Sequence, residues 1–559
     1  MNGNTSTTAK AERLSDAARL AAQWKTIDWK LAEAEVNRLQ VRIAKATQEK
    51  KWNTVKRLQY LLTHSYYAKL LAVRKVTSNK GKKTPGVDNV LWNTPAQKMN
   101  AAFSLTDKGY KASPLRRAYI EKKGKKTKRP LGIPTMYDRA MQALYALALD
   151  PVSEVTADKH SFGFRKGRCA QDACEYIFTD LARAVSPEWV LEGDIKGCFD
   201  NISHEWLIAN IPMDKSILKQ FLKAGFVFKG ELFPTDDGTP QGGVISPILA
   251  NMALDGMEKV LSDRFHTNRL GKIDRRWKGV HKVNLVRYAD DFVITAATKE
   301  IAMEAKGIIR DFLKTRGLEL SEEKTVISHI DDGFDMLGWT FRKFKGKLIV
   351  KPSKKAIKAI VATLSETILR RGKAWKQELL IERLNQKIRG WANYHQSVCA
   401  SKIFSHIDNM LYEFLWQWAK RRHPRKGKRW IAGKYWHRRG NRNWVFSTED
   451  SKNLLRVDHI PIVRHTKVRM DANPYLEPEY FIQRQFNHGM ERLSGRFKQV
   501  WKNQNGCCYH CGQPMDISDD KKIFFKIQKS KGGKDEVRNM AYVHKHCQTL
   551  FLERRSKEL

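Results

Sequence analysis

Residues 283–295 read VNLVRYADDFVIT, and this stretch decides the fold because it sets two adjacent aspartates, Asp290 and Asp291, between two apolar runs. Apolar runs on either side of a short polar pair predict a β-hairpin with both carboxylates at or beside its tight turn. Successive strand side chains point to opposite faces, so one aspartate is free to face a site while the other faces its support. Two buried anions without partners would be very costly. A cation is therefore expected, and Mg²⁺, which prefers oxygen ligands, is the candidate.

A second acid lies in a matching setting. The strand-like run WVLEGD, residues 189–194, leads into Asp194 just before a turn. Carboxylates from two strand ends would hold two metal ions in the arrangement that activates an attacking 3′-oxygen in nucleotidyl transfer. A single Asp-Asp pair is more often a solvated turn, but the two acidic segments together favour a metal site. Between them, GTPQGGVISPILAN at 238–251 predicts a glycine-rich loop that opens a helix.

The bulk composition indicates a multidomain protein with a polyanionic partner. The chain has 559 residues, and its 103 Lys+Arg against 59 Asp+Glu give a formal net charge of +44. No long uncharged apolar stretch and no secretory signal pattern is present, which favours a protein without a membrane segment. The expected location is the cytoplasm or an organelle, and the nucleoid if the polyanionic partner is bacterial DNA.

Helical patterns flank the central region. Residues 24–71 alternate charged and apolar residues at helical spacing, and residues 352–420 carry an apolar stripe whose expected role is core packing. The stripe comprises Ile381, Leu384, Ile388 and Trp391.

A basic tract at residues 420–444 contains eleven Lys/Arg and no acid, with tryptophan and tyrosine interleaved. A run of charge alone usually marks a solvated face. Cations bind phosphates while aromatic rings stack on bases, so the mixture favours a nucleic-acid groove. The candidate contacts are Arg389, Lys420, Arg421, Arg422, Arg425, Lys428, Arg429, Trp430, Lys434, Trp436, Arg438 and Arg439.

The C-terminal cysteines have metal-ligand spacing. Cys508 and Cys511 form a C-x₂-C pair, and His544 and Cys547 form an H-x₂-C pair. Two such pairs predict a structural, tetrahedral Zn²⁺ site. Cys507 is a possible substitute for Cys508, but it lacks the two-residue spacing.

Six segments resemble, in order and spacing, the successive blocks of a group II intron reverse transcriptase. A further segment, LNQKIRGWANYHQ at 384–396, resembles the maturase domain of the same intron-encoded proteins. The six are RPLGIPTMYDRAMQ (129–142), SFGFRKGRCAQDA (161–173), DIKGCFDNISH (194–204), GTPQGGVISPILAN (238–251), RYADDFVI (287–294) and LELSEEKT (318–325).

The resemblance implies an α+β, right-hand polymerase of fingers and palm with a helical thumb formed by the maturase domain. A helical N-terminal extension precedes the fingers. Its end, KTPGVD at 83–88, is similar to a segment that helps hold template and intron RNA. The implied domains are an N-terminal extension (1–90), fingers and palm (91–350), thumb (351–425), a basic DNA-binding region (426–500) and a small zinc-binding ββα domain (501–559).

The resemblance also implies residue roles. Asp194 and Asp290 match the acids that bind two Mg²⁺ ions, and Asp291 matches a third acid. Phe199 matches the aromatic that crowds the sugar 2′ position, and Gln241 matches a residue that packs on the incoming nucleotide. The remaining nucleotide-binding candidates are Lys122, Arg129, Ile195 and Lys324. Lys123, Lys125 or Lys126 could take the place of Lys122. Lys324 is expected either to donate a proton to pyrophosphate or to form a salt bridge with Glu322 or Glu323.

The C-terminal segment KSKGGKDEVRNM, residues 529–540, resembles the centre of an HNH endonuclease. In that pattern a His-His pair precedes the loop and a histidine follows the last cysteine, whereas this chain has Phe524, Phe525 and Gln548 there. Phenylalanine neither accepts a proton nor binds a metal. We therefore expect a degenerate nuclease fold without second-strand cleavage.

The resemblance implies an RNA-directed DNA polymerase that is also a maturase. Such a protein is expected to bind its intron RNA, target DNA and dNTPs, and to support splicing, reverse splicing and retrohoming. One alternative is a splicing-only RNA-binding maturase, against which the intact acids Asp194, Asp290 and Asp291 argue. Another is a reverse transcriptase of a defence or CRISPR-type system, against which the maturase-like stretch and the zinc tail argue.

Overall fold

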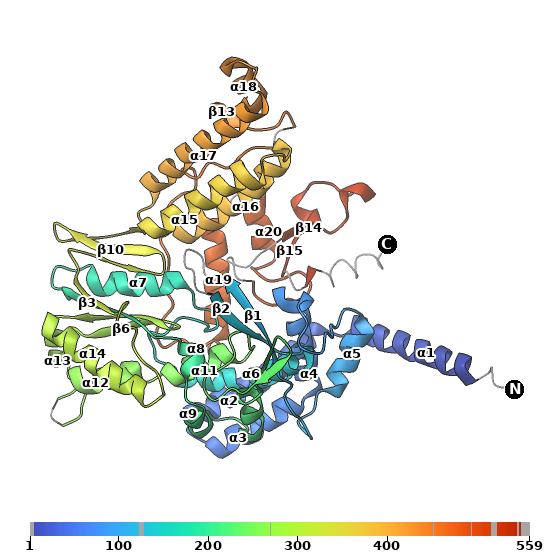
Figure 1. Cartoon of the computed structure of the whole chain (residues 1–559), viewed down its shortest axis with the longest axis vertical. Coiled ribbons are helices and arrows are strands. Elements are labelled where there is room, and N and C mark those ends of the chain that lie inside the picture. Colours follow the sequence, from blue (N-terminus) through green and yellow to red (C-terminus); the bar gives the residue numbers. More distant parts are fainter. Residues whose placement is uncertain are drawn as a thin grey trace.

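The computed structural model describes residues 5–121, 128–268, 270–450, 452–493, 495–515, 522–544 and 547–548. Lys122 and its substitutes Lys123, Lys125 and Lys126 lie outside these residues. Figure 1 shows a lower body built from the first two thirds of the chain and a helical arm that rises from it. None of the helices in the described ranges is long and apolar enough to span a lipid bilayer.

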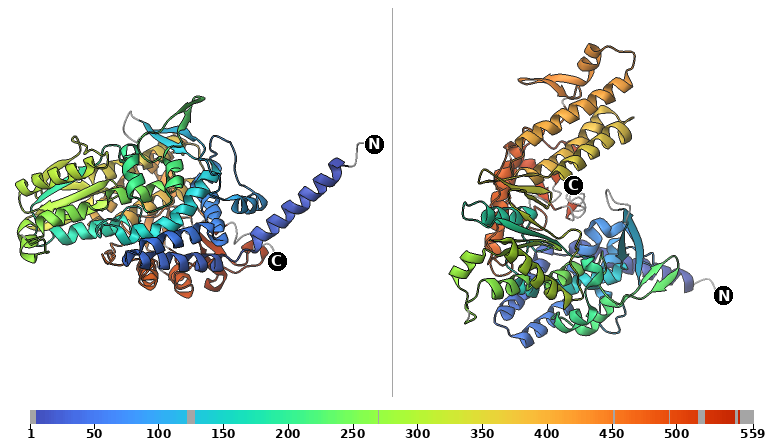
Figure 2. Two further views of the ribbon diagram at one scale, coloured as in Figure 1. Left: turned by 90° about the horizontal axis from the view of Figure 1, so that it is seen from below. Right: turned by 60° about the vertical axis from the view of Figure 1, so that its left-hand side comes forward.

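The helical N-terminal region packs on one long buried helix of the body, α6. Gln40 ties the two together, because its side-chain amide donates to the carbonyl of Leu147 on α6 at 2.7 Å. Asp28 starts α2 by accepting hydrogen bonds from two backbone amides of its first turn. The first helix projects from the body (Figures 1 and 2). The helices are α1 Thr5–Thr26, α2 Trp29–Gln48, α3 Trp52–His64, α4 Tyr66–Ser78, α5 Pro95–Ser104 and α6 Met136–Thr156.

The fingers contain a four-stranded sheet in the order β2-β1-β4-β5. Its strands are β1 Leu115–Glu121, β2 Lys128–Ile133, β4 Phe226–Phe228 and β5 Glu231–Phe233. Short helices lie in the sequence between the palm strand that ends at Asp194 and the palm strand that begins at Asn284, with β4 and β5 among them. They are α8 Cys198–Asn201, α9 His204–Asn210, α10 Lys215–Leu222, α11 Ser246–Leu254, α12 Met257–Phe265 and α13 Arg275–His281.

The palm sheet has the order β6-β7-β3-β8 and separates two hydrophobic cores. Leu191 and Ile294 belong to the core shared with the N-terminal helices, whereas Val190 and Val293 belong to the core shared with the thumb. This alternation follows from the two-residue period of a strand. The elements are α7 Ala170–Leu181, β3 Trp189–Asp194, β6 Asn284–Tyr288, β7 Asp291–Ala296, α14 Lys299–Lys314 and β8 Val326–His329.

The arm corresponds to the expected helical thumb. The predicted apolar stripe packs as core, with Ile381, Leu384 and Ile388 buried and Trp391 half-buried. A small sheet joins the arm to the palm. The elements are β9 Phe334–Met336, β10 Trp339–Phe344, β11 Lys347–Pro352, α15 Lys354–Ser365, η2 Glu366–Arg371, α16 Gln377–His395, α17 Ser401–Arg422, α18 Lys428–Tyr435, β12 Trp436–Arg439 and β13 Arg442–Phe446.

After the arm, the chain returns to the palm and ends in a small module. Buried Asp172 of α7 accepts hydrogen bonds from the Arg484 guanidinium at 2.5 Å and the Val468 amide at 2.8 Å, and its other neighbour is His465 at 3.0 Å. These bonds tie the returning segment to the palm. The last elements are α19 Pro478–Arg492, α20 Gly495–Asn503, β14 Lys522–Phe525 and β15 Met540–Val543.

Candidate active site and metal cluster

The hairpin predicted from the sequence is present, and its turn holds Asp290. Tyr288 of β6 pairs with Asp291 of β7, leaving Ala289 and Asp290 as the two turn residues. Ala289 has a φ of 58°, a left-handed conformation that is costly for a residue with a side chain. A Cβ on Gly163 would come within 2.3 Å of the Ala289 nitrogen, so only glycine allows the neighbouring backbone to pack on the turn.

The strand register brings the acids of the two segments together. Asp194 at the end of β3 lies directly opposite Asp291 on β7. Directly opposed residues of an antiparallel pair have Cα atoms about 4.5–5.5 Å apart and side chains on the same face. Asp194 and Asp290 both line one cavity of about 500 Å³, whereas Asp291 lies exposed outside that lining. On the opposite face Phe292 covers Gly193, where a Cβ would lie 2.1 Å from the ring.

A buried ion pair supports the turn from below. The Arg287 guanidinium is fully buried, lies 2.5 Å from an oxygen of Asp255 and donates to the carbonyl of Ala289 at 3.3 Å. It also donates to the side-chain oxygen of Asn251 at 3.3 Å, and the Asn251 amide donates to the carbonyl of Gly163 at 2.8 Å. Three segments that are distant in sequence therefore hold one turn.

The electrostatics of the acids favour a cation. Burial raises the pKa of Asp290, and the nearby carboxylate of Asp194 raises it further. Asp291 is exposed as a residue, but the surrounding protein partly desolvates its carboxyl group. This desolvation, followed by the charges of Asp290 and Asp194, raises the pKa of Asp291 to about 6. Clustered carboxylate oxygens of this kind suit Mg²⁺, which takes oxygen ligands and would relieve their repulsion.

Lys324 forms an ion pair with Asp194. The segment carrying it is held along the end of β3, because the Ser321 amide donates to the Asp194 carbonyl at 2.8 Å. Glu322, one of the two expected alternative partners, instead pairs with Lys306 at 2.7 Å and Arg310 at 3.5 Å. Lys324 therefore lies at the cavity.

The other predicted nucleotide contacts in the described chain line the same cavity. Phe199 meets the ring of Phe164 edge-on, with centroids 6.1 Å apart. Gln241 donates to a carboxylate oxygen of Asp200 at 3.2 Å, and Arg129 lies on the fingers side on β2. Ile195 lines the cavity although its side chain is buried.

Phe164 and Asp200 are among the cavity-lining residues that sequence reasoning missed. Phe164 has a φ of 61° and an exposed ring, which is unusual for a large residue. Its setting in the glycine-containing stretch SFGFRKG was the available signal. Asp200 is one residue beyond Phe199, and its part in holding Gln241 depends on tertiary contact.

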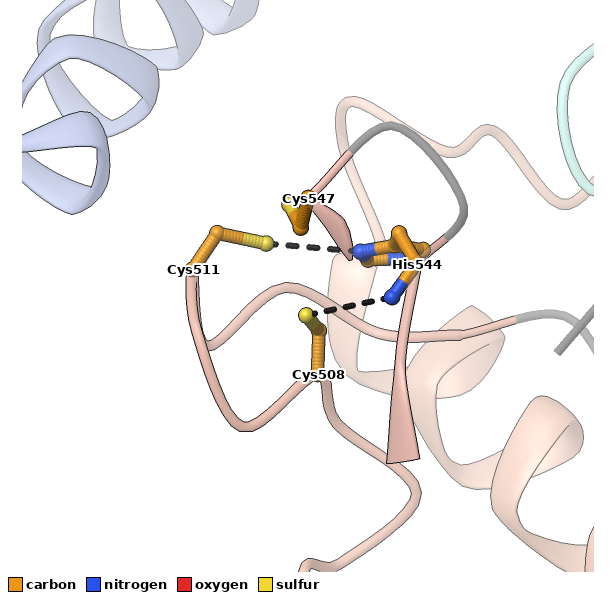
Figure 3. Close-up of side chains that lie close together, drawn as sticks. All are labelled: Cys508, Cys511, His544 and Cys547. Atoms are coloured by element: carbon orange, nitrogen blue, oxygen red, sulfur yellow. Dashed lines mark hydrogen bonds between the residues drawn. The ribbon is translucent and has the colours of Figure 1, made fainter. Parts of the chain in front are cut away.

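The C-terminal cysteine and histidine residues come together as predicted (Figure 3). One ligand atom from each of Cys508, Cys511, His544 and Cys547 lies within 4.8 Å of the others, and all four residues are buried. His544 donates from Nε2 to the Pro514 carbonyl at 3.1 Å, which leaves Nδ1 facing Cys511 Sγ at 3.4 Å. Three sulfurs and one imidazole nitrogen form a donor set that fits tetrahedral Zn²⁺. Cys507 is outside the cluster.

The two strands β14 and β15 pair beside this cluster, with Phe524 opposite Ala541 and Phe525 opposite Met540. Asn539 holds the intervening loop, because its side chain accepts from the Ile527 amide at 2.8 Å and donates to the carbonyl of Lys534 at 2.8 Å. The helix that would complete a ββα fold falls largely outside the described residues.

The basic tract surrounds the tip of the arm. In the parts of the chain that the structure describes, its Lys and Arg residues form no ion pair with an acid. Trp436 does not fit the expected role, because it is 7% exposed and packs against Trp416 and Phe446 in the core. Arg422 lies over the Trp418 ring, and Arg439 bonds to the backbone of Thr448. The candidate nucleic-acid contacts that are exposed are Arg389, Lys420, Arg421, Arg422, Arg425, Lys428, Arg429, Trp430, Lys434 and Arg438.

Three family models match the chain. Residues 120–341 match the model described as reverse transcriptase (RNA-dependent DNA polymerase). Residues 24–105 match the N-terminal domain of reverse transcriptase, and residues 357–436 match the group II intron maturase-specific domain.

Curated relatives agree with these matches. The chain is 32% identical to the group II intron-encoded protein LtrA of Lactococcus lactis subsp. cremoris over 370 residues, which covers 56% of this chain and 61% of that protein. It is 31% identical to the protein YkfC of Escherichia coli K12, covering 53% of this chain and 84% of that protein. A Candida albicans telomerase structure matches at 13% identity with a TM-score of 0.33, covering 58% and 65% of the two chains, and is too distant to add to the assignment.

Proposed function

Because the chain belongs to the group II intron-encoded reverse transcriptases, we propose that it is an RNA-directed DNA polymerase and maturase that copies its own intron RNA into DNA. The observation that carries the proposal is the single cavity where Asp194 and Asp290 meet Arg129, Phe199 and Gln241. A protein that only bound RNA would have no need of clustered acids beside a nucleotide-sized cavity.

The acids and Lys324 have different roles in nucleotidyl transfer. Asp194 and Asp290 hold Mg²⁺, with Asp291 as a third, more exposed acid. Mg²⁺ bound there would supply Lewis-acid chemistry, with a lower pKa for the primer 3′-hydroxyl and a balancing charge for the pyrophosphate. Lys324 lies against Asp194, where its ammonium is within reach of the leaving group and available to give it a proton. Arg129 binds the triphosphate from the fingers.

Phe199 and Gln241 select the nucleotide. The Phe199 ring is supported by Phe164 and lines the same cavity as Asp194, so it excludes a sugar that carries a 2′-hydroxyl. Gln241 packs on the incoming nucleotide, and its hydrogen bond to Asp200 fixes its amide.

The C-terminal module is a structural Zn²⁺ finger of degenerate HNH type that binds DNA and does not cut the second strand. Cys508, Cys511, His544 and Cys547 hold the metal. Phe524 and Phe525 stand where the resemblance calls for histidines, and they offer neither a base nor a metal ligand. Sequence-specific nicking of the bottom strand of a target duplex by the purified ribonucleoprotein would overturn this part of the proposal.

The partners are the intron RNA, with which the protein forms a ribonucleoprotein, and the target DNA. The net charge of +44 and the exposed cations of the arm support binding to a large polyanion. The domain limits that we propose remain 1–90, 91–350, 351–425, 426–500 and 501–559.

Primer extension on an RNA template tests the polymerase. We expect the wild type to extend the primer with dNTPs and Asp290→Ala to lose activity by at least about a thousandfold, because the remaining acids cannot hold both ions. If wild type and Asp290→Ala are equally inactive while the protein still assists intron splicing, the splicing-only alternative is correct. Sequencing the RNA that copurifies separates an intron partner from a defence-system RNA.

A further inference from the structure

The tip of the helical arm contains an open cleft of about 550 Å³, far from the acidic cavity. Its walls come from three elements that are separate in sequence: the middle of α17, the first turns of α18, and β13 (Figure 1). The lining residues that matter here are Tyr412, Trp416, Gln417, Lys428, Arg429 and Trp444.

Trp444 is held in an unusual state at the edge of this cleft. Its φ of 61° is left-handed, a conformation that is strained for a bulky residue, and the residue is 60% exposed. Neither the strain nor the exposed indole helps the fold. The pairing of β12 with β13 shifts register between His437 and Arg439, which leaves one extra residue on the strand that carries Trp444. Such a bulge commonly re-aims a side chain. Trp444 is therefore presented to the cleft at a cost in stability.

A row of aromatic rings leads from the thumb core to the floor of the cleft. The ring centroids of Phe446 and Trp436 lie 5.2 Å apart, and those of Trp436 and Trp416 lie 5.4 Å apart. Trp416 stacks on Tyr412 with centroids 6.2 Å apart and an angle of 21° between the ring planes. The row ends at Tyr412, which is 45% exposed. Buried rings fix the orientation of the outer ones, so the last face is a rigid platform for another flat ring.

The cleft also carries the charges that suit a polynucleotide. Lys428 and Arg429 lie at its rim, and within the described residues neither forms an ion pair. Gln417 and Glu413 line the same space and offer an amide and a carboxylate to the edge of a base. Aromatic faces, edge-reading polar groups and adjacent cations together match a nucleobase with its flanking phosphates.

We propose that this cleft binds one unstacked nucleobase of a single-stranded polynucleotide between Tyr412 and Trp444, while Lys428 and Arg429 hold the neighbouring phosphates. The inference rests on the nucleic-acid binding of the proposed function and adds to it a defined base-binding site outside the polymerase cavity. DNA and RNA share the chemistry that is recognised.

Photo-crosslinking and affinity measurements on the full-length protein test the site. The probes are one short single-stranded sequence prepared as DNA and as RNA, each with a single iodouracil, at one fixed salt concentration. We expect the crosslink to map to Trp444 or Tyr412. We expect Trp444→Ala and Tyr412→Ala each to weaken binding by about 5- to 150-fold, the range for the loss of one base stack, and Trp444→Phe to restore most of the affinity. The tighter of the two probes identifies the source of the base.

Trp277→Ala is the matched control, because Trp277 is an exposed tryptophan on α13, remote from the arm. It should bind both probes like the wild type. Unchanged affinity in Trp444→Ala and Tyr412→Ala, an equal loss in Trp277→Ala, or crosslinks confined to other residues would overturn the inference. Primer extension distinguishes failure of the cleft assignment from failure of the proposed function. If the wild type extends primers but any of these contradicting results is obtained, only the cleft assignment fails. If the wild type neither binds nor extends, the proposed function fails with it.

Discussion

Asp290 owes its place to residues that take no part in the chemistry. Arg287 lies beneath the turn and contacts Asp255, Asn251 and the Ala289 carbonyl. Its guanidinium is fully buried, so the pair with Asp255 is stable only while both charges are present. The chemistry of a single aspartate thus depends on a buried ion pair one layer below it.

Arg287→Ala should destabilise the palm by about 3–5 kcal/mol, because it leaves the buried Asp255 carboxylate without its partner. Urea denaturation followed by tryptophan fluorescence measures the loss. Arg264→Ala is the control, since its pair with Glu304 is exposed and should cost less than about 1 kcal/mol. Equal stability of the two variants would contradict the role of Arg287.

Phe199 offers a test of sugar selection at the same scale. Phe199→Val and Phe199→Ala should raise the kcat/KM for ribonucleotides relative to deoxynucleotides by at least about tenfold, because a smaller side chain leaves room for the 2′-hydroxyl. Single-nucleotide extension on an RNA template gives the ratio. Phe344→Ala, an exposed phenylalanine on β10, serves as the control. An unchanged ratio in the Phe199 variants would show that another residue excludes the hydroxyl.

Among the elements, the C-terminal module combines a small apolar core with the proposed metal site. Its buried cluster contains Val500, Trp501, Met515, Met540 and Tyr542 together with the cysteines. So small a core supplies little stability by itself, and bound metal commonly makes up the difference. The pair of strands β14 and β15 depends on the cluster, because two of the cluster residues precede β14 and the other two follow β15.

Removing the metal should therefore unfold this element. Cys508→Ser, or chelation of the wild type, is expected to abolish bound zinc and to increase amide hydrogen exchange across residues 507–544. Cys507→Ser is the matched control, because its thiol is adjacent in sequence and outside the cluster. Elemental analysis and exchange mass spectrometry measure both effects. Zinc retained at full occupancy in Cys508→Ser would rule out the proposed ligand set.

At the scale of the whole molecule, the acids of the palm cavity and the basic tract lie in separate parts of the fold. Acids gather at the palm cavity, whereas exposed cations cover the arm. The segment after the arm folds back onto the palm through Asp172 and Arg484, and Tyr475 bonds to Asp150 on α6. These contacts connect the arm, the palm and the N-terminal helices, so they would hold a polynucleotide on the arm, as proposed, in a fixed relation to the acids.

Such a surface predicts a strong dependence of nucleic-acid affinity on salt. The logarithm of the binding constant should fall linearly with the logarithm of salt concentration, with a slope of about −0.7 per phosphate contact for single strands. Removing Lys428 and Arg429 together should reduce the slope by about 1.4. Filter binding over a salt series measures it. A flat response would be incompatible with a phosphate-binding arm.

Much of the site could be read from the sequence because its signals are local. The alternation around Asp290 and Asp291 is a property of neighbouring residues, and it correctly predicted the hairpin. The C-x₂-C and H-x₂-C pairs likewise fixed the members of the metal cluster. Ordered motifs identified the family, because motif order and spacing survive where overall identity is near 30%.

Other features were decided only by tertiary structure. The pairing of Asp194 with Asp291, the burial of Trp436 and the presentation of Trp444 each depend on contacts between segments distant in sequence. A composition-based argument assigned Trp436 to ligand binding, yet the thumb core takes that ring and leaves Trp444 outside. Local pattern specifies which residues form a strand or bind a metal, whereas packing decides which face each side chain presents, because burial is a property of the whole fold.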